Sequence, residues 1–334
     1  MLTVGLGLEL VRTMDEFLGI DTSNYTTSAA IYVPGASQIT QQKQLLPVKK
    51  GLLGLKQSDA VFGHVKQLPQ VLGSLLADKA ATLTAVGVSV SPRDAEGSYM
   101  PCFLVGKTVA EAIGLVNRIP VHPFSHQTGH VAAALYGCGL LELLAKNFIA
   151  FHVSGGTTEM LLVEPDEERI INITQIGGTL DLNAGQAVDR VGRMLGLPFP
   201  AGRALDRLAR QSGNTYLDKA ATRPTIRGLN CSLSGVENKC MKLLEHGLAK
   251  EDIARFCIDY IARALEAMTK LAVERYGSLP IVYAGGVMSN TLIRSHMEAV
   301  YGGMAHFASP EYSSDNAAGV ALLAAVKEGA CDRG

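Results

Sequence analysis

Apolar residues form two pairs of short runs, and a turn of small polar residues separates the runs of each pair. In the first pair, the run at 17–20 leads into Ser-Asn-Tyr-Thr-Thr at 23–27, and a second run follows at 28–33. In the second pair, the run at 148–153 leads into Ser-Gly-Gly-Thr-Thr at 154–158, and a second run follows at 160–163. Apolar runs on both sides of such a turn are typical of β-hairpins. The pattern therefore predicts two β-hairpins with similar turns.

The parts that follow each hairpin are also repeated. A helical stretch and an apolar run at 85–92 follow the first hairpin, whereas several helices and a strand at 279–287 that opens into a glycine turn follow the second. Two α/β lobes of similar construction predict a duplicated actin-like fold, as in sugar kinases and heat-shock ATPases, with a nucleotide cleft between the lobes. The alternative is two unrelated hairpins that share common turn residues.

The second turn is a candidate phosphate site. Backbone N–H groups and hydroxyls of a Gly, Ser and Thr turn point into one concavity, and glycine permits a ligand to approach closely. The candidate nucleotide-binding residues of this turn are Ser154, Gly155, Gly156, Thr157 and Thr158.

Length and composition indicate a globular protein of two domains. The chain has 334 residues, of which 47% are hydrophobic and 18% charged, so it is long enough for two cores and too apolar to be disordered. We expect a disordered extension at 1–13, an N-terminal lobe at 14–146 and a C-terminal lobe at 147–334, with the last helix, at about 315–328, packing back on the N-terminal lobe. Periodicity does not determine whether the helical stretch at 251–276 packs in a core or at an interface.

The charge and the cysteines restrict the partners and the compartment. Because the net charge is −1, a nucleic acid would have to be bound by a local basic patch. Scattered cysteines without a CxxC pair indicate reduced thiols, and no apolar run reaches the roughly 20 residues that a bilayer requires. We therefore expect a cytoplasmic protein that does not interact with a membrane. The candidate basic residues, for which a solvated surface is the alternative, are Lys43, Lys49, Lys50, Lys56, Lys66, Arg203, Arg207, Arg210, Arg223 and Arg227.

Two histidines are candidate metal ligands. His126 and His130 precede a strong helix-forming run, and their spacing of four places both imidazoles on one face of a helix. Such a pair needs a further ligand, and we expect Asp315, which also has the sequence context of a helix N-cap. Two His and one carboxylate suit Fe(II) or Zn(II). Because Gln127 stands where a zinc protease needs a glutamate, peptidase activity is disfavoured.

Eight segments, in this order, resemble the family of tRNA threonylcarbamoyladenosine synthases, earlier described as O-sialoglycoprotein endopeptidases or glycoproteases. The resemblance extends from about Phe17 to Leu323. The segments are Gly-Ile-Asp-Thr-Ser at 19–23, His126 with His130, Ser-Gly-Gly-Thr-Thr at 154–158, Asp-Leu-Asn-Ala-Gly-Gln-Ala-Val-Asp-Arg at 181–190, Pro-Ala-Gly at 200–202, Ser-Leu-Ser-Gly at 232–235, Ala-Gly-Gly-Val-Met-Ser-Asn at 284–290 and Ser-Asp-Asn-Ala-Ala at 314–318.

The resemblance implies a fold, a reaction and partners. Members of the family have the duplicated actin-like fold and transfer threonylcarbamoyl from its adenylate to the N6 amine of the tRNA adenosine beside the anticodon. The implied cofactors are one divalent metal (Fe or Zn) and ATP or an adenylate. The implied partners are tRNA, a non-catalytic paralogue and an ATPase of the threonylcarbamoylation system.

The resemblance also assigns roles to residues. His126, His130 and Asp315 would hold the metal, and the turn at 154–158 would cradle the nucleotide phosphates. The residues implied to surround ribose and adenine are Asp189, Gly202, Asp206, Gly285, Gly286 and Asn290. Without the motif, Asp189 and Asp206 would be interpreted as solvated helix surface.

The chain departs from the family pattern at several positions. The first turn usually reads Thr-Ser-Cys-Asp-Glu-Thr, and Tyr25 occupies the place of its catalysis-linked aspartate. A phenol, with an ordinary pKa of about 10, does not replace a carboxylate as base at neutral pH. Gln186 and Thr157 stand where glutamate and histidine are usual, and Arg93 stands where glycine is expected.

These departures leave three functions open. We expect a metal-dependent acyltransferase that acts on tRNA. One alternative is a divergent paralogue that binds nucleotide and metal as a regulatory or assembly subunit without turnover. The other is a transferase of carbamoyl or phosphoryl groups to a small molecule, since the actin-like fold hosts many chemistries.

Overall fold

The structure is a computed structural model that describes residues 15–23, 25–47, 55–77, 83–312 and 317–331. It contains two compact units, one formed by the described residues up to His126 together with 320–331, and one by the described residues of Gln127–Gly319. The predicted extension at 1–13 lies outside the described residues. Among the described helices, none combines the length and the apolar character that crossing a bilayer requires.

The first unit is built on a five-stranded sheet in the order β3-β2-β1-β4-β5. β1, β2 and β3 are antiparallel, and β4 and β5 continue the sheet parallel to β1. The strands are β1 (Glu16–Asp21), β2 (Thr26–Val33), β3 (Gln38–Leu45), β4 (Leu83–Ser91) and β5 (Val121–Ser125), and the unit's helices are α1 (Gln57–Leu76) and α2 (Phe103–Asn117), with most of α9 (Ala317–Lys327).

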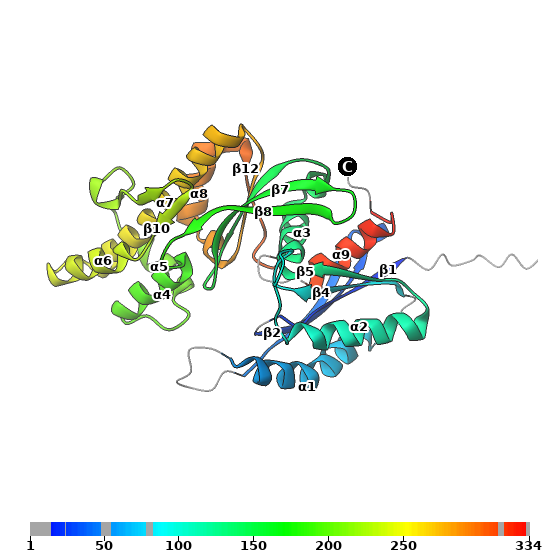
Figure 1. The fold of residues 1–334 in the computed structure, drawn as a ribbon. Helices are drawn as coiled ribbons and strands as arrows, with labels where there is room; N and C mark the ends of the chain where they lie inside the picture. Colours follow the sequence, from blue (N-terminus) through cyan, green and yellow to red (C-terminus); the bar gives the residue numbers. More distant parts are fainter. Residues whose placement is uncertain (1–14, 24, 48–54, 78–82, 313–316, 332–334) are drawn as a thin grey trace, which may run out of the picture. The chain divides into compact units, whose positions relative to one another are not determined.

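Alternate residues of the central strands face different helices. Leu18 and Ile20 of β1 belong to a core with apolar residues of α1 and α2, which lie on one face of the sheet (Figure 1). The other face carries α9, and there Gly87 of β4 permits a close approach, because a Cβ atom at Gly87 would lie 2.0 Å from the carbonyl oxygen of Val320. Period-two alternation therefore buries both faces of this sheet.

The second unit is built on a seven-stranded sheet in the order β12-β11-β6-β7-β8-β10-β9. Its strands are β6 (Phe148–Val153), β7 (Thr158–Asp166), β8 (Ile170–Thr179), β9 (Thr225–Arg227), β10 (Asn230–Ser232), β11 (Ile281–Ala284) and β12 (Ala305–Phe307). Its helices are α3 (His126–Cys138), α4 (Ala184–Met194), α5 (Gly202–Ala209), α6 (Gly235–Glu245), α7 (Lys250–Tyr276) and α8 (Thr291–Tyr301).

The strand orders of the two sheets confirm the predicted duplication. The hairpin β1–β2 corresponds to the hairpin β6–β7, and β11 lies parallel to β6 as β4 lies parallel to β1. The order β3-β2-β1-β4-β5 in the first sheet is repeated as β8-β7-β6-β11-β12 in the second. The two hairpin turns therefore occupy equivalent positions, each at the end of the first strand of its sheet.

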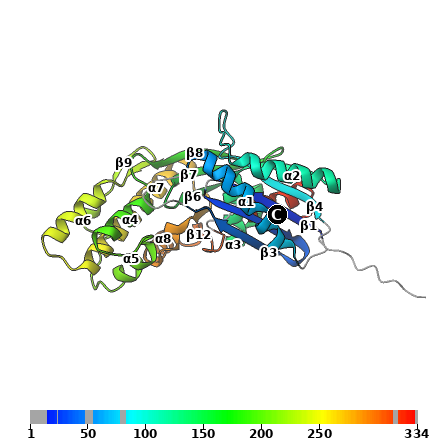
Figure 2. The same ribbon diagram turned by 90° about the horizontal axis from the view of Figure 1, so that it is seen from below.

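Helix α7 packs in the core of the second unit, which settles a question that the sequence left open. Most of its apolar residues are buried, and it contacts α5, α6 and α8, which lie near it in Figures 1 and 2. Asp259, also buried on α7, accepts hydrogen bonds from Arg255 Nε at 2.8 Å and from the backbone N–H of Tyr216 at 2.7 Å. The buried charge is therefore compensated.

Candidate functional site

A cavity of about 630 Å³ lies within the second unit. Glycines, two aspartates and one arginine line it, together with apolar side chains of α4, α7 and α8. Six of the residues predicted to bind nucleotide line this cavity, namely Gly155, Asp189, Gly202, Asp206, Gly286 and Asn290. The structure thus brings together residues from segments that are far apart in the sequence, whereas their role in nucleotide binding stays a prediction.

The turn at 154–158 is closed by its own hydrogen bonds. Ser154 donates its backbone N–H to the carbonyl oxygen of Thr157 at 2.8 Å, and Gly156 donates its N–H to Ser154 Oγ at 3.3 Å. A Cβ atom at Gly155 or Gly156 would meet no other atom within 4 Å, so both glycines border open space. The turn has the small, open surface that a bound phosphate requires.

The first residues of α4 fix this turn in place. Gly185 N donates to the carbonyl oxygen of Ser154 at 3.1 Å, and Asn183 Nδ2 donates to that of Gly156 at 2.9 Å. A Cβ atom at Gly185 would lie 2.6 Å from the Cα atom of Gly155, so only glycine permits this approach. Gln186, which departs from the family pattern, accepts a hydrogen bond from Asn183 N at 3.2 Å and so helps to cap α4.

The predicted ribose-binding aspartates are partly buried at the cavity. Asp189 accepts a hydrogen bond from Ala201 N at 2.7 Å, and this contact fixes the start of α5. Asp206 pairs with Arg210 at 3.1 Å and accepts a hydrogen bond from Thr291 at 3.3 Å. Neither aspartate is therefore fully solvated helix surface, which was the alternative interpretation.

The glycine turn after β11 forms a further part of the cavity wall. Gly285 has a φ of +100°, and a Cβ atom there would lie 2.3 Å from the carbonyl oxygen of Val153, so this position requires glycine. Asn290 follows the turn and caps α8, because its Oδ1 accepts from Leu292 N at 3.0 Å and from Ile293 N at 3.1 Å. These two hydrogen bonds hold the polar side chain of Asn290 in place at the cavity.

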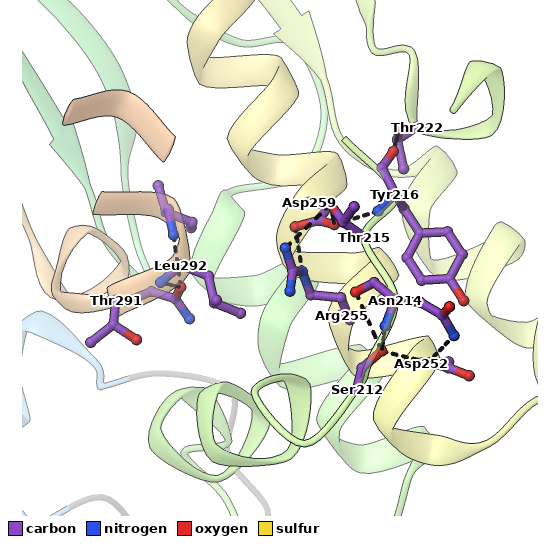
Figure 3. Close-up of polar contacts among 12 residues, drawn as sticks. Ser212, Asn214, Thr215, Tyr216, Thr222, Asp252, Arg255, Asp259, Thr291 and Leu292 are labelled. Atoms are coloured by element: carbon purple, nitrogen blue, oxygen red, sulfur yellow. Dashed lines mark hydrogen bonds and ion pairs between the residues drawn. The ribbon is translucent and has the colours of Figure 1, made fainter. Parts of the chain in front are cut away.

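A polar network anchors the chain that follows α5, the helix that carries Gly202 and Asp206. Asp252 of α7 accepts hydrogen bonds from Ser212 Oγ at 2.5 Å and from Asn214 Nδ2 at 3.0 Å, and Figure 3 shows these contacts beside those of Arg255 and Asp259. The end of α5 is therefore tied to α7 by side-chain hydrogen bonds, which keeps this wall of the cavity in place.

In the first unit, His126 is held by a carboxylate that the sequence analysis did not select. Asp21 is 1% exposed, and its Oδ2 lies 2.9 Å from His126 Nδ1. It also accepts hydrogen bonds from Ser23 N at 2.7 Å and from Ser89 Oγ at 2.5 Å. Burial alone would raise the pKa of the Asp21 carboxyl, but the charge of His126 and these hydrogen bonds lower it from 3.8 to about 2. Its place in the sequence, a charged residue at the end of an apolar strand, is the signal by which Asp21 could have been predicted as a site residue.

His130, one turn further along α3, has different neighbours. Its ring lies 4.5 Å from that of His152, centroid to centroid, and Gln127 on the same helix donates to the buried Glu159 at 3.0 Å. Within 15–23, 25–47, 55–77, 83–312 and 317–331, no group of three His, Cys, Asp or Glu side chains could hold a metal ion. Asp315 lies outside these ranges, so the predicted metal site stays a prediction.

Tyr25 stands at the first hairpin turn with a partly exposed side chain, 37% accessible. Its carbonyl oxygen accepts a hydrogen bond from Leu46 N at 2.8 Å, so the turn is joined to the end of β3. An aromatic ring therefore stands at the turn where the resemblance implies a carboxylate.

Comparisons with known proteins agree with this architecture. Residues 36–322 match the model of the family described as tRNA N6-adenosine threonylcarbamoyltransferase. A protein of that name from Streptococcus equi subsp. zooepidemicus is 35% identical over 75% of this chain and 72% of its own length. One from Chloroherpeton thalassium is 31% identical over 93% of this chain and 91% of its own.

Solved structures show the same fold at low identity. Component A of (R)-2-hydroxyglutaryl-CoA dehydratase from Acidaminococcus fermentans has a TM-score of 0.56 at 17% identity and covers 94% of this chain and 99% of its own. HypF from T. kodakarensis has a TM-score of 0.57 at 12% identity, over 96% of this chain and 49% of its own. These neighbours confirm the actin-like fold. From the match to its family model and its curated relatives, the chain belongs to the tRNA N6-adenosine threonylcarbamoyltransferase family.

Proposed function

We propose that this protein transfers a threonylcarbamoyl group from an adenylate donor to the N6 amine of a tRNA adenosine. The observation that carries the proposal is the cavity of the second unit, where six of the residues implied to bind the nucleotide meet in a chain of this family. Its volume of about 630 Å³ is within the range usual for small-molecule sites.

The lining residues suit the parts of an adenylate. The carboxylates of Asp189 and Asp206 can accept hydrogen bonds from ribose hydroxyls, in addition to the contacts that they already make. Gly202 and Gly286 border open space and allow a flat base to approach closely. Gly155 places the turn at 154–158 on the same cavity, where its backbone would face the phosphate.

The reaction is an acyl transfer. The N6 amine attacks the carbonyl carbon of the threonylcarbamoyl group, a C–N bond forms, and the bond from that carbon to the phosphate oxygen breaks. AMP leaves with the bonding electron pair, and the amine gives up one proton. A cavity that holds the donor supplies the orientation that such a step requires.

We further propose that His126, His130 and Asp315 hold one divalent metal. The setting of His126 fits this role, because metal-binding histidines commonly place their other ring nitrogen on a carboxylate, as His126 Nδ1 does on Asp21. His126 Nε2 would then be the nitrogen that binds the ion. When bound, the metal would neutralise negative charge on the donor and polarise its carbonyl.

A second candidate is a nucleotide-binding subunit without turnover, and Tyr25 is the observation that favours it. Its partly exposed ring stands at a turn where the family pattern has an acidic side chain. A third candidate, transfer to a small molecule, has no particular contact in its favour.

Release of AMP from threonylcarbamoyl-adenylate, measured with and without tRNA, tests the proposal. We expect the wild type to release AMP faster with tRNA than without it. Release that does not depend on tRNA would favour a small-molecule acceptor. No release by the wild type, together with release by Tyr25→Asp, would favour the subunit without turnover.

A further inference from the structure

Arg203 is the one cationic side chain among the described residues that line the cavity of the second unit. It stands in the first turn of α5, directly after Gly202, and its side chain is exposed. The other charged residues that line the cavity are Asp189 and Asp206.

The two carboxylates already have partners of their own. Asp189 accepts the backbone N–H of Ala201 at 2.7 Å, and Asp206 pairs with Arg210 at 3.1 Å. Within the ranges that the structure describes, Arg203 makes no ion pair with either of them, nor with any other acidic side chain. Its guanidinium therefore stands at the cavity, and none of the described carboxylates forms an ion pair with it.

The position of this charge on α5 is specific. Leu205 and Ala209 bury one face of the helix, and Arg203, Arg207 and Arg210 lie on its exposed side. Arg207, one turn after Arg203, is also exposed but does not line the cavity. Arg207 therefore provides the same residue type on the same helix, away from the cavity.

We propose that Arg203 binds the phosphate of the adenine nucleotide and thereby makes the cavity select nucleotides over neutral nucleosides. This inference rests on the proposed function, because it takes the cavity to be the adenylate site. A guanidinium can donate two parallel N–H···O bonds to a phosphate, and it keeps its charge at any physiological pH. Adenosine, which lacks the phosphate, gains nothing from Arg203.

Calorimetric titration of AMP and adenosine into the full-length protein tests the inference. We expect Arg203→Gln to weaken AMP binding about tenfold and to leave adenosine binding within twofold of the wild type. Arg203→Lys should have an AMP affinity between those of the wild type and Arg203→Gln, since lysine keeps the charge but cannot donate two parallel hydrogen bonds. Arg207→Gln, the matched control, should change neither affinity, and equal unfolding temperatures of the variants should show that all remain folded.

Two results would overturn the inference while leaving the proposed function intact. Either Arg203→Gln leaves AMP binding unchanged, or it weakens AMP and adenosine binding by the same factor, as expected if Arg203 only packs at the rim. A wild type that binds neither AMP nor adenosine would overturn the proposed adenylate site and this inference together.

Discussion

At the scale of single residues, Asp21 has an environment unlike that of an ordinary exposed carboxylate. It is buried, it contacts His126, and its pKa is about 2. A carboxyl group whose pKa is lower in the folded state than in the unfolded state stabilises the protein above the unfolded value of 3.8, and that stabilisation is lost as the pH falls towards 2. Asp21 therefore links the stability of the first unit to acid pH.

We predict that Asp21→Asn lowers the unfolding free energy by about 2 to 3 kcal/mol at pH 6, from a pKa difference of about two units. The gap between wild type and variant should narrow by about 1 kcal/mol at pH 3, since the wild-type contribution is then partly lost. Urea denaturation at several pH values measures the gap, with the exposed Asp59→Asn as control. A difference in unfolding free energy that stays constant from pH 6 to pH 3 would contradict a lowered pKa of Asp21 in the folded protein.

The sequence allowed several residue positions to be predicted, but few of their contacts. Gly155, Asp189 and Asn290 were selected through motifs, and the structure places all three at one cavity. The role of Asp21 could not be predicted, because its partner His126 is 105 positions away and nothing local links the two. The position of Arg203 at the cavity was likewise not predictable, since helical periodicity shows only that Arg203 lies on an exposed face of its helix.

At the scale of elements, the turn at 154–158 and the start of α4 form one structural piece. Three contacts join them, from Asn183 Nδ2, from Gly185 N and from Ala184 N, the last to Thr158 Oγ1 at 2.9 Å. The apolar runs predicted the hairpin correctly, because its strands are regular. The docking of α4 on the turn could not be predicted, since it depends on a glycine whose missing side chain leaves no signal in a hydrophobic pattern.

We predict that Gly185→Ala destabilises the protein by about 1 to 3 kcal/mol and weakens AMP binding at least tenfold. In an open helix this change would stabilise, because alanine is the better helix former, but here the new Cβ would overlap Gly155. Thermal unfolding and AMP titration measure both effects.

Gly73→Ala in α1 is the matched control, because Gly73 is also helical and a Cβ atom there would meet nothing within 4 Å. If Gly185→Ala bound AMP as tightly as the wild type, the turn would have no part in holding the nucleotide.

At the scale of the whole molecule, the repeated strand order was predictable from the sequence, whereas the walls of the cavity were not. Two similar hairpins, each followed by a parallel strand, indicated the duplication that the sheets confirm. The cavity depends on how α4, α5, α7 and α8 converge, and their packing follows from tertiary contacts such as those of Asp252 with Ser212 and Asn214 (Figure 3). A pattern along the chain does not contain such contacts.

The central claim, transfer of threonylcarbamoyl to tRNA, is tested most directly by mass spectrometry of the tRNA nucleosides. The tRNA is first incubated with this protein, threonylcarbamoyl-adenylate, a divalent metal and the accessory proteins of a relative. The relative from Streptococcus equi subsp. zooepidemicus serves as positive control. We predict that the wild type adds the threonylcarbamoyl group to adenosine and that Asp206→Asn, altered at the cavity, adds at least tenfold less. Unmodified tRNA with the wild type, under conditions in which the relative modifies it, would contradict the proposed transfer.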